Sequence, residues 1–279
     1  MIVKWKSTDG RGNFGDEIGG LLESFATPDG LKDLHSDDKR FFLLGSVINE
    51  SWLTESIQEV GAENVYYWGC GFRGERISSD LLRGINISGV RGFETQKYLA
   101  YHNISTDVVG DTALLLPLLY RKPRQTGRSI FIPHILDDKR HTYRAQDLGV
   151  DEIIQPDTGS IDEVLSLIMK IAGARFVLSG AMHAGIVACA YDVPFAFYKS
   201  DKRDSPVKYV DFLSVFSRKL YPEFVASAQE GELWYRKNAR KFKKVSLARI
   251  LKAAPFAVLK KYIISARLAD LRKRLGVSA

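Results

Sequence analysis

The sequence predicts an α/β protein of two Rossmann-like domains that face each other across a cleft, followed by a basic helical tail. Two series of short β-rich runs alternate with amphipathic segments, which is typical of parallel sheets covered by helices. Residues 121–128 separate the two series with a polar stretch that contains Pro and Gly and has no periodicity. The excess positive charge lies near the end of the chain. We therefore expect domains at 1–122 and 127–220, and the tail at 236–279.

The composition is that of a globular protein. Of the 279 residues, 45% are hydrophobic and 26% are charged, which is enough apolar material for one large core or two small ones. No run of 18 apolar residues occurs, and residues 1–6 lack the apolar stretch of a secretory signal. Cys70 and Cys189 lie far apart inside apolar runs, which excludes a disulfide framework and a cysteine-rich zinc site. We expect a protein of the reducing cytoplasm.

The strands and helices of both domains follow from their patterns. Short runs rich in β-branched and aromatic residues predict strands at 2–6, 41–45, 64–69, 85–90 and 106–109, and again at 129–133, 152–155, 175–179 and 195–198. Apolar residues at helical spacing predict helices at 16–25, 52–60, 94–102, 161–172 and 182–191. Ligands of such sheets bind beyond the carboxyl ends of the strands, so the loops after the strands are where a site is expected.

The loop after the first predicted strand contains G-x-G-x-x-G, from Gly10 to Gly15, and opens a predicted helix. Glycines there let backbone N–H groups approach an anion near the start of the helix. A dinucleotide site also needs an acid after the second strand, whereas Asp37 and Asp38 precede that strand. The loop therefore favours a ligand other than a dinucleotide, with a nucleotide site and a purely structural turn as the alternatives.

The segment 175–198 combines a buried strand, a Ser-Gly turn and a helix of small residues. His183 falls in the first turn of that helix, beside unpaired N–H donors and the positive end of the helix dipole. An anionic substrate docked there would exchange a proton with the imidazole, which titrates near neutral pH. The alternative is a histidine that only hydrogen-bonds near the start of the helix.

Several short motifs follow one another in a characteristic order: Asn13-x-Gly15-Asp16, Gly69-Cys70-Gly71, Val90-Arg91-Gly92, Val109-Gly110-Asp111 and the stretch from Ser179 to Pro194. Over about residues 8 to 200, this order resembles the polysaccharide pyruvyl transferases, which are bacterial enzymes with a fungal relative. Family members move pyruvate from phosphoenolpyruvate onto a sugar as a ketal. Their fold is similar to that of the two-domain GT-B glycosyltransferases, so the resemblance implies a GT-B-like arrangement.

The resemblance implies that His183 is catalytic, as the acid that protonates the methylene carbon of the donor and the base that later accepts a hydroxyl proton. The family hallmark Ser-x-Arg-Leu-His-Ala appears here as Ser179-Gly180-Ala181-Met182-His183-Ala184, so the arginine that holds the donor is replaced by Ala181. Donor contacts must therefore be partly rearranged.

The donor carries a phosphate and a carboxylate, so the site must hold two anions. We predict that Arg91, His134 and the turn of Ser179, Gly180 and Met182, through its backbone N–H groups, bind the donor. The alternatives are a surface ion pair for Arg91 and a solvent-facing loop position for His134.

The acceptor sugar is expected on the first domain, opposite the donor. Asn13 and Asp16 would face the cleft there and hydrogen-bond the sugar. An acid at the start of a helix also complements the helix dipole, which is the alternative for Asp16. No spacing of His, Cys or acidic residues typical of a metal site occurs, so we expect no metal and no cofactor beyond the donor substrate.

The tail holds 14 Lys and Arg and one acid from Arg236 onward, with apolar and basic residues at helical spacing over 245–251 and 255–264. Such a helix lies in a membrane interface with its cations toward lipid phosphates. Packing of the tail on the first domain is the alternative, and nucleic acid is not expected because no binding fold is recognisable. The tail and a lipid-linked acceptor together predict a cytoplasmic enzyme that is peripheral on the inner face of the cell membrane.

Two other functions compete with the pyruvyl transferase. A GT-B glycosyltransferase using a nucleotide sugar would share the fold but would present an acid for the ribose hydroxyls late in the second domain, where no convincing candidate occurs. A non-catalytic protein that binds membranes or nucleic acid and retains the fold is the other alternative, because Ala181 replaces the arginine of the hallmark.

Overall fold

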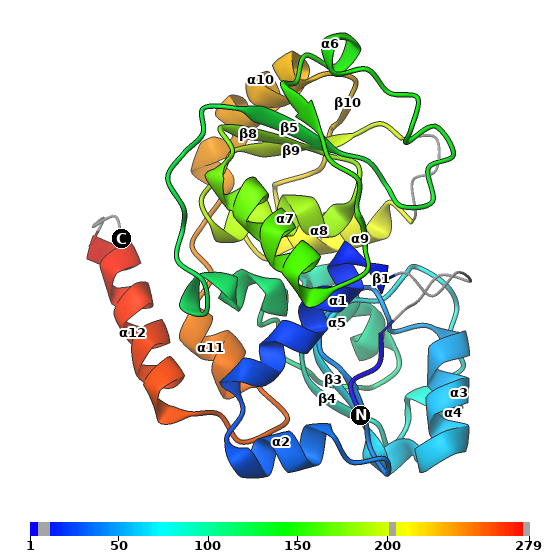
Figure 1. The fold of residues 1–279 in the computed structure, drawn as a ribbon. Helices are drawn as coiled ribbons and strands as arrows, with labels where there is room; N and C mark the ends of the chain where they lie inside the picture. The colour runs from blue at the N-terminus through cyan, green and yellow to red at the C-terminus, as the bar shows by residue number, and fades with distance from the viewer. Residues whose placement is uncertain (5–11, 201–204, 276–279) are drawn as a thin grey trace.

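The computed structural model describes residues 1–4, 12–200 and 205–275, and it shows a mixed α/β protein with two parallel sheets (Figure 1). The smaller sheet has the order β2-β3-β4 and the larger has the order β10-β9-β8-β5-β6. A two-stranded antiparallel sheet joins β1 to β7. The strands are β1 (Gly12–Asn13), β2 (Arg40–Phe42), β3 (Val65–Cys70), β4 (Asn86–Val90), β5 (Ser129–Ile132), β6 (Glu152–Ile153), β7 (Asp157–Thr158), β8 (Phe176–Ser179), β9 (Phe195–Tyr198) and β10 (Phe224–Val225).

Helices lie between most of these strands, which is why the strands pair in parallel. The α-helices are α1 (Phe14–Leu21), α2 (Pro28–Leu34), α3 (Glu50–Val60), α4 (Ser79–Leu82), α5 (Phe93–Tyr101), α6 (Ala145–Leu148), α7 (Ile161–Gly173), α8 (Met182–Ala190), α9 (Val207–Ser214), α10 (Ala228–Asn238), α11 (Leu247–Lys252) and α12 (Lys260–Leu275). The 3₁₀ helices are η1 (Leu22–Phe25), η2 (Ala62–Asn64), η3 (Thr112–Leu118) and η4 (Ala239–Lys241).

Local sequence fixes where the helices begin. The side chain of Asn49 accepts a hydrogen bond from the N–H of Trp52 and starts α3, and Ser160 accepts from Glu163 and starts α7 in the same way. Nearly all of the predicted strands and helices are confirmed within a few residues. The exception is 106–109, of which only Val108 forms a single bridge, to Val90. The predicted strand at 2–6 falls partly outside the described residues, and Ile2 forms a bridge with Phe41.

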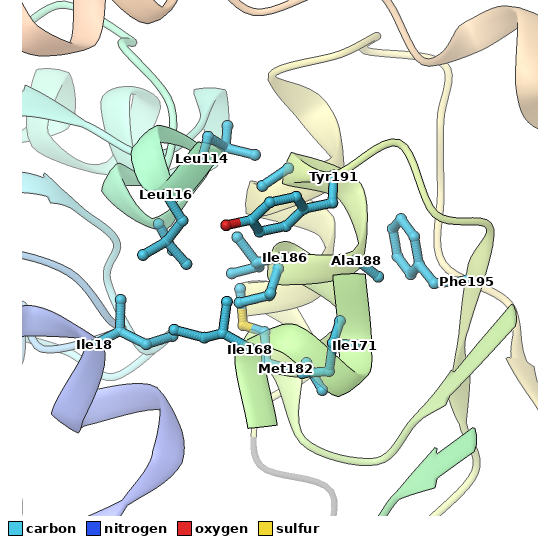
Figure 2. Close-up of a cluster of buried hydrophobic side chains, with 14 of the residues drawn as sticks. Ile18, Leu114, Leu116, Ile168, Ile171, Met182, Ile186, Ala188, Tyr191 and Phe195 are labelled. Carbon is cyan, nitrogen blue, oxygen red and sulfur yellow. The ribbon is translucent and has the colours of Figure 1, made fainter. Parts of the chain in front are cut away.

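One apolar core connects the two parallel sheets. Ile18 of α1 and Leu114 of η3 lie in the same buried cluster as Ile168 of α7 and Ile186 of α8 (Figure 2). A second, smaller core, which includes Tyr67, fills the space around the three-stranded sheet. Helix α8 is thus packed on several sides, and the residues at its start have a fixed position.

The chain after residue 220 contributes to both halves of the molecule. Strand β10 pairs with β9, and α10 packs on the larger sheet, where a Cβ on Gly231 would stand 2.8 Å from the ring of Phe176. The chain then returns to the smaller sheet, where Trp68 Nε1 donates a hydrogen bond to the carbonyl of Ile250 at 2.9 Å. The domain bounds given above stay a prediction.

The segment 245–251, predicted to face a membrane, is instead packed against the protein. Leu247, Ile250 and Leu251 are buried, because their apolar side contacts the half of the molecule that holds the smaller sheet. This is the alternative considered above for the tail, and it corrects the prediction for these residues. Among the residues that the structure describes, no helix is long and apolar enough to cross a membrane.

Candidate functional site

A pocket lies beyond the carboxyl ends of strands from both parallel sheets, as expected for open α/β sheets. The loops after β2, β3, β5 and β8 line it, together with the starts of α1, α8 and α9. Five of the residues proposed from the sequence meet there, namely His183, Met182, His134, Asn13 and Asp16. The full lining is Asn13, Gly15, Asp16, Gly45, Ser46, Val47, Trp52, Arg73, His134, Ile135, Leu136, Ala181, Met182, His183 and Lys208.

His183 is held in the first turn of α8 against α1. A Cβ on Gly15 would lie less than 3.0 Å from the imidazole, so only a glycine at this position leaves room for the ring. Its Nε2 is buried and has no hydrogen-bond partner within the described part of the chain. Burial, together with the positive charges of Arg91 and Lys208, lowers the pKa of His183 to about 3. The imidazole is therefore neutral near pH 7.

The start of α8 presents backbone donors to the pocket. Its N-cap is Ala181, which has no side-chain hydrogen bond to offer, and the N–H groups of Met182 and His183 have no acceptor within the helix. Such donors, together with the helix dipole, favour an anion. The side chain of Met182 packs in the apolar cluster (Figure 2). Its backbone N–H is one of the donors that the start of α8 brings to the pocket.

Ser179 and Gly180 brace the turn instead of lining the pocket. The hydroxyl of Ser179 donates to the carbonyl of Ala181 at 2.5 Å. The N–H groups of Gly180 and Ala181 both donate to the carbonyl of Ile132, at 2.7 and 3.2 Å. A Cβ on Gly180 would lie 2.9 Å from the backbone nitrogen of His134, which explains the glycine. The structure thus does not bring these two residues to the ligand position, because their polar groups are already satisfied.

Arg91 also lies behind the pocket. Its guanidinium is fully buried, with Nε 3.0 Å from a carboxylate oxygen of Asp211 and Nη1 2.9 Å from the hydroxyl of Ser46. Only Ser46 of these three lines the pocket. A surface ion pair, the alternative considered for Arg91, is wrong because both partners are in the interior. The residue connects the pocket wall to α9.

Asn13 and Asp16 form a pair at the start of α1. The amide Nδ2 of Asn13 donates to a carboxylate oxygen of Asp16 at 2.6 Å. The pKa of Asp16 is raised to about 6, because the effect of burial outweighs the hydrogen bond from Asn13 and the positive charges of Lys208 and Arg73. Asp16 also lies in the first turn of α1, where it complements the helix dipole. The two residues Gly10 and Arg11 of the glycine loop lie outside the described residues.

His134 lies in the loop after β5, half-buried at the pocket wall. Its Nδ1 accepts a hydrogen bond from the N–H of Leu136 at 3.2 Å. The neutral ring therefore carries its proton on Nε2. A fully solvent-facing position, the alternative for this residue, is not what the structure shows.

Two pocket cations were not found from the sequence. Arg73 lies in the loop after β3, two residues beyond the Gly69-Cys70-Gly71 motif, so its place near a strand end was an available signal. Lys208 lies at the start of α9 and is largely buried, 6% exposed. No motif surrounds it, and only the fold brings it to the pocket. With these cations the pocket offers positive charge, backbone donors and three further titratable side chains, Asp16, His134 and His183.

Comparisons with known proteins give one finding. A sequence model of the family described as polysaccharide pyruvyl transferase matches residues 62–202, about half of the chain. The matched range includes Arg73, His134 and His183 of the pocket, whereas Asp16 and Lys208 lie outside it. No curated protein and no solved structure matches the chain.

Proposed function

The chain belongs to the polysaccharide pyruvyl transferase family, and from this premise we propose that it moves pyruvate from phosphoenolpyruvate onto a sugar as a ketal. The acceptor is a sugar of a bacterial exopolysaccharide, capsule or cell-wall glycan precursor. One observation carries the proposal: the pocket combines a neutral histidine at the start of a helix with two cations, Arg73 and Lys208. The proposed reaction uses phosphoenolpyruvate as donor substrate and no further cofactor.

The donor brings two anionic groups, and the pocket offers matching positive groups without the arginine of the family hallmark. Ala181 occupies that position, but Arg73 and Lys208 line the same pocket. The N–H groups of Met182 and His183 add donors at the positive end of α8. We assign the phosphate and the carboxylate of the donor to these groups, because charge-assisted hydrogen bonds are the strongest available in such a site.

His183 carries the proton in the proposed reaction. The neutral imidazole gains a proton when the anionic donor binds, because nearby negative charge raises the pKa of a histidine. It gives this proton to the methylene carbon, and an acceptor hydroxyl adds to the central carbon and returns its proton to the imidazole. The bond from the central carbon to the phosphate oxygen then breaks. A second hydroxyl adds, and its proton leaves with the phosphate.

The acceptor is assigned to the wall of the pocket formed by α1. Asn13 and Asp16 present an amide and a carboxyl group there, on the element that packs against His183. Such groups orient sugar hydroxyls by hydrogen bonds. The position of α1 beside α8 supports the proposal that the acceptor and the donor meet at His183.

The arrangement of the two parallel sheets supports a GT-B-like fold of two Rossmann-like domains, which we retain as part of the proposal. Each sheet contributes loops from its carboxyl ends to one pocket. A lipid-linked acceptor would place the enzyme at the inner face of the cell membrane, so we also propose a cytoplasmic, membrane-peripheral location.

Calorimetric titration with phosphoenolpyruvate, beside titration with UDP-sugars, tests the proposal. We expect saturable binding of phosphoenolpyruvate alone. Arg73→Gln should weaken it about tenfold or more, since a hydrogen bond to a charged group contributes about 1.5–3 kcal/mol. Lys97→Gln removes an exposed cation of α5 outside the pocket and serves as the control. Binding of a UDP-sugar without phosphoenolpyruvate would instead make the protein a glycosyltransferase.

A second measurement separates binding from chemistry. His183→Ala keeps Arg73, Lys208 and the backbone donors of α8, so it should still bind phosphoenolpyruvate. Phosphate release with an acceptor glycoside should fall by about 10²–10⁴-fold, which is the usual contribution of general acid–base catalysis. Undiminished phosphate release in His183→Ala would remove the histidine from the mechanism.

A further inference from the structure

Helix α12 exposes a row of large apolar side chains. Ile264, Leu268, Leu271 and Leu275 are 57%, 52%, 52% and 69% exposed. Their spacing of four, three and four residues places them on one face of the helix. Single exposed apolar residues are ordinary, but a continuous row of four marks a surface that contacts something apolar. We call these four side chains the α12 stripe.

Cations border the α12 stripe on both sides. At about 100° per residue, Lys261 and Arg272 fall on one side of the stripe, and Lys260, Arg267 and Arg274 fall on the other. The helix therefore presents an apolar row between two basic rows.

The acid of α12 does not offset these charges. Asp270 is turned toward the start of α11, where its carboxylate accepts hydrogen bonds from the Ser246 hydroxyl at 2.7 Å and from the N–H groups of Leu247 and Ala248 at 2.9 and 3.1 Å. No other acid occurs between residues 260 and 275. Apart from Ser265, every exposed residue of α12 is thus basic or apolar.

The opposite face of α12 is fixed to the protein. Ala266 is fully buried, and the ring of Tyr262 meets that of Phe25 edge to face at 4.9 Å. Figure 1 shows α12 along the outside of the molecule, next to α11. Because the inner face is packed, the helix cannot turn its stripe inward, and the stripe stays directed to the surroundings.

We propose that the α12 stripe binds the surface of an anionic phospholipid membrane. The apolar side chains would enter the boundary between headgroups and acyl chains, and the flanking cations would lie at the lipid phosphates, as in interfacial amphipathic helices. The inference rests on the proposed membrane location and not on the proposed reaction. In this proposal, the membrane-binding part of the tail is α12 and not the buried segment 245–251.

The charges beside the α12 stripe favour a membrane over a second copy of this chain as its partner. A symmetric pair of α12 helices would bring the same basic rows together, and like charges across an interface oppose association. An anionic lipid surface offers the opposite charge along the whole row. The stripe therefore fits a membrane better than its own copy.

Co-sedimentation of the full chain with vesicles tests the proposal. We expect binding to vesicles of phosphatidylglycerol and phosphatidylcholine, and at least tenfold weaker binding to phosphatidylcholine alone. The double variant Leu268→Asn/Leu271→Asn should weaken binding at least tenfold, with an unchanged melting temperature. Leu233→Asn on α10 changes a leucine that is 61% exposed away from the stripe, and it should bind like the wild type.

Other outcomes would overturn the inference. Equal vesicle binding by the double variant, or no binding by the wild type, excludes the stripe as a membrane surface. A wild-type dimer in analytical ultracentrifugation that the double variant converts to a monomer would assign the stripe to a second copy. Titration of the same samples with phosphoenolpyruvate keeps the two proposals apart, because the double variant should bind this donor normally.

Discussion

The imidazole of His183 lies against the backbone of Gly15 with no room for a side chain between them. The contact joins the start of α1 to the start of α8, two elements about 170 residues apart in sequence whose pairing only the fold sets. It explains why a glycine stands at this position. The orientation of the histidine ring therefore depends on α1.

Gly15→Ala should displace the ring of His183. The added methyl group would lie less than 3.0 Å from the imidazole, and overpacking of this kind costs about 1–3 kcal/mol. We expect a lower melting temperature and a loss of phosphate release much larger than the loss of donor binding. Gly20→Ala in the same helix is the matched control, because its Cβ would meet only the flexible end of Lys4. A Gly15→Ala protein with wild-type phosphate release would contradict the assigned role of this contact.

Asp16→Asn should stabilise the protein above pH 6. Because the pKa of Asp16 is raised from 3.8 to about 6, the folded state binds more protons than the unfolded state between these values. The contribution of this group to stability thus falls as the pH rises from about 4 to 6. The gain from the substitution should be near zero at pH 4 and reach at most about 3 kcal/mol above pH 6. Urea unfolding at several pH values measures it.

His183→Asn should show the opposite pH dependence of stability in the same urea unfolding experiment. The pKa of His183 is lowered from 6.5 to about 3, so its contribution to stability is present above pH 6.5 and is lost as the pH falls toward 3. The variant should lose less stability on acidification than the wild type. Identical pH profiles for the wild type and both variants would show that neither group is desolvated in the folded protein.

Removing one member of the Arg91–Asp211 pair should destabilise the fold strongly. Both side chains are fully buried, and an unpaired charge in the interior costs about 3–5 kcal/mol. Asp211→Leu should therefore cost about this much, and the double variant Arg91→Met/Asp211→Leu should cost less than the single one. Asp80→Ala, which breaks the exposed pair with Arg83, should change little. Urea denaturation gives all three values, and an additive double variant would refute the coupling.

The sequence predicts the sheets of this protein better than the details of its pocket. Strands such as β3 and β8 are mostly apolar runs that are almost entirely buried, so local pattern identifies them. Strand β10 has two residues and is held by its pairing with β9, which no local pattern records. The same limit applies to the tail, where 245–251 shows the spacing of an amphipathic helix whether its apolar side meets a membrane or the protein.

The pocket shows the same difference: residues near strand ends could be predicted from the sequence, whereas contacts between distant parts of the chain could not. His183 and Asp16 were predicted because each lies in a loop or first helical turn after a strand. Arg91 also follows a strand, but its side chain turns back to Asp211, a partner 120 residues later that sequence spacing does not identify. Lys208 reaches the pocket from α9 without any motif. The sequence therefore does not show which way a side chain points, or which residues from distant parts of the chain it contacts.

An arginine at position 181 should substitute for Lys208. If Lys208 holds one anionic group of the donor, Lys208→Gln should weaken binding of phosphoenolpyruvate by about ten- to a hundredfold, which corresponds to about 1.5–3 kcal/mol. Ala181 lines the same pocket and is the N-cap of α8. In the double variant Lys208→Gln/Ala181→Arg, the guanidinium would stand where the family hallmark places it and restore part of the affinity.

The matched control is Lys208→Gln/Ala181→Met, which adds a side chain of similar reach without a charge. Calorimetric titration with phosphoenolpyruvate at two salt concentrations separates the two variants, because only the arginine adds a charge that salt screens. Recovery by methionine as well as by arginine would mean that filling the pocket, and not charge, restores binding. In that case Lys208 would not replace the missing arginine, and the anionic donor would be held by Arg73 and the start of α8 alone.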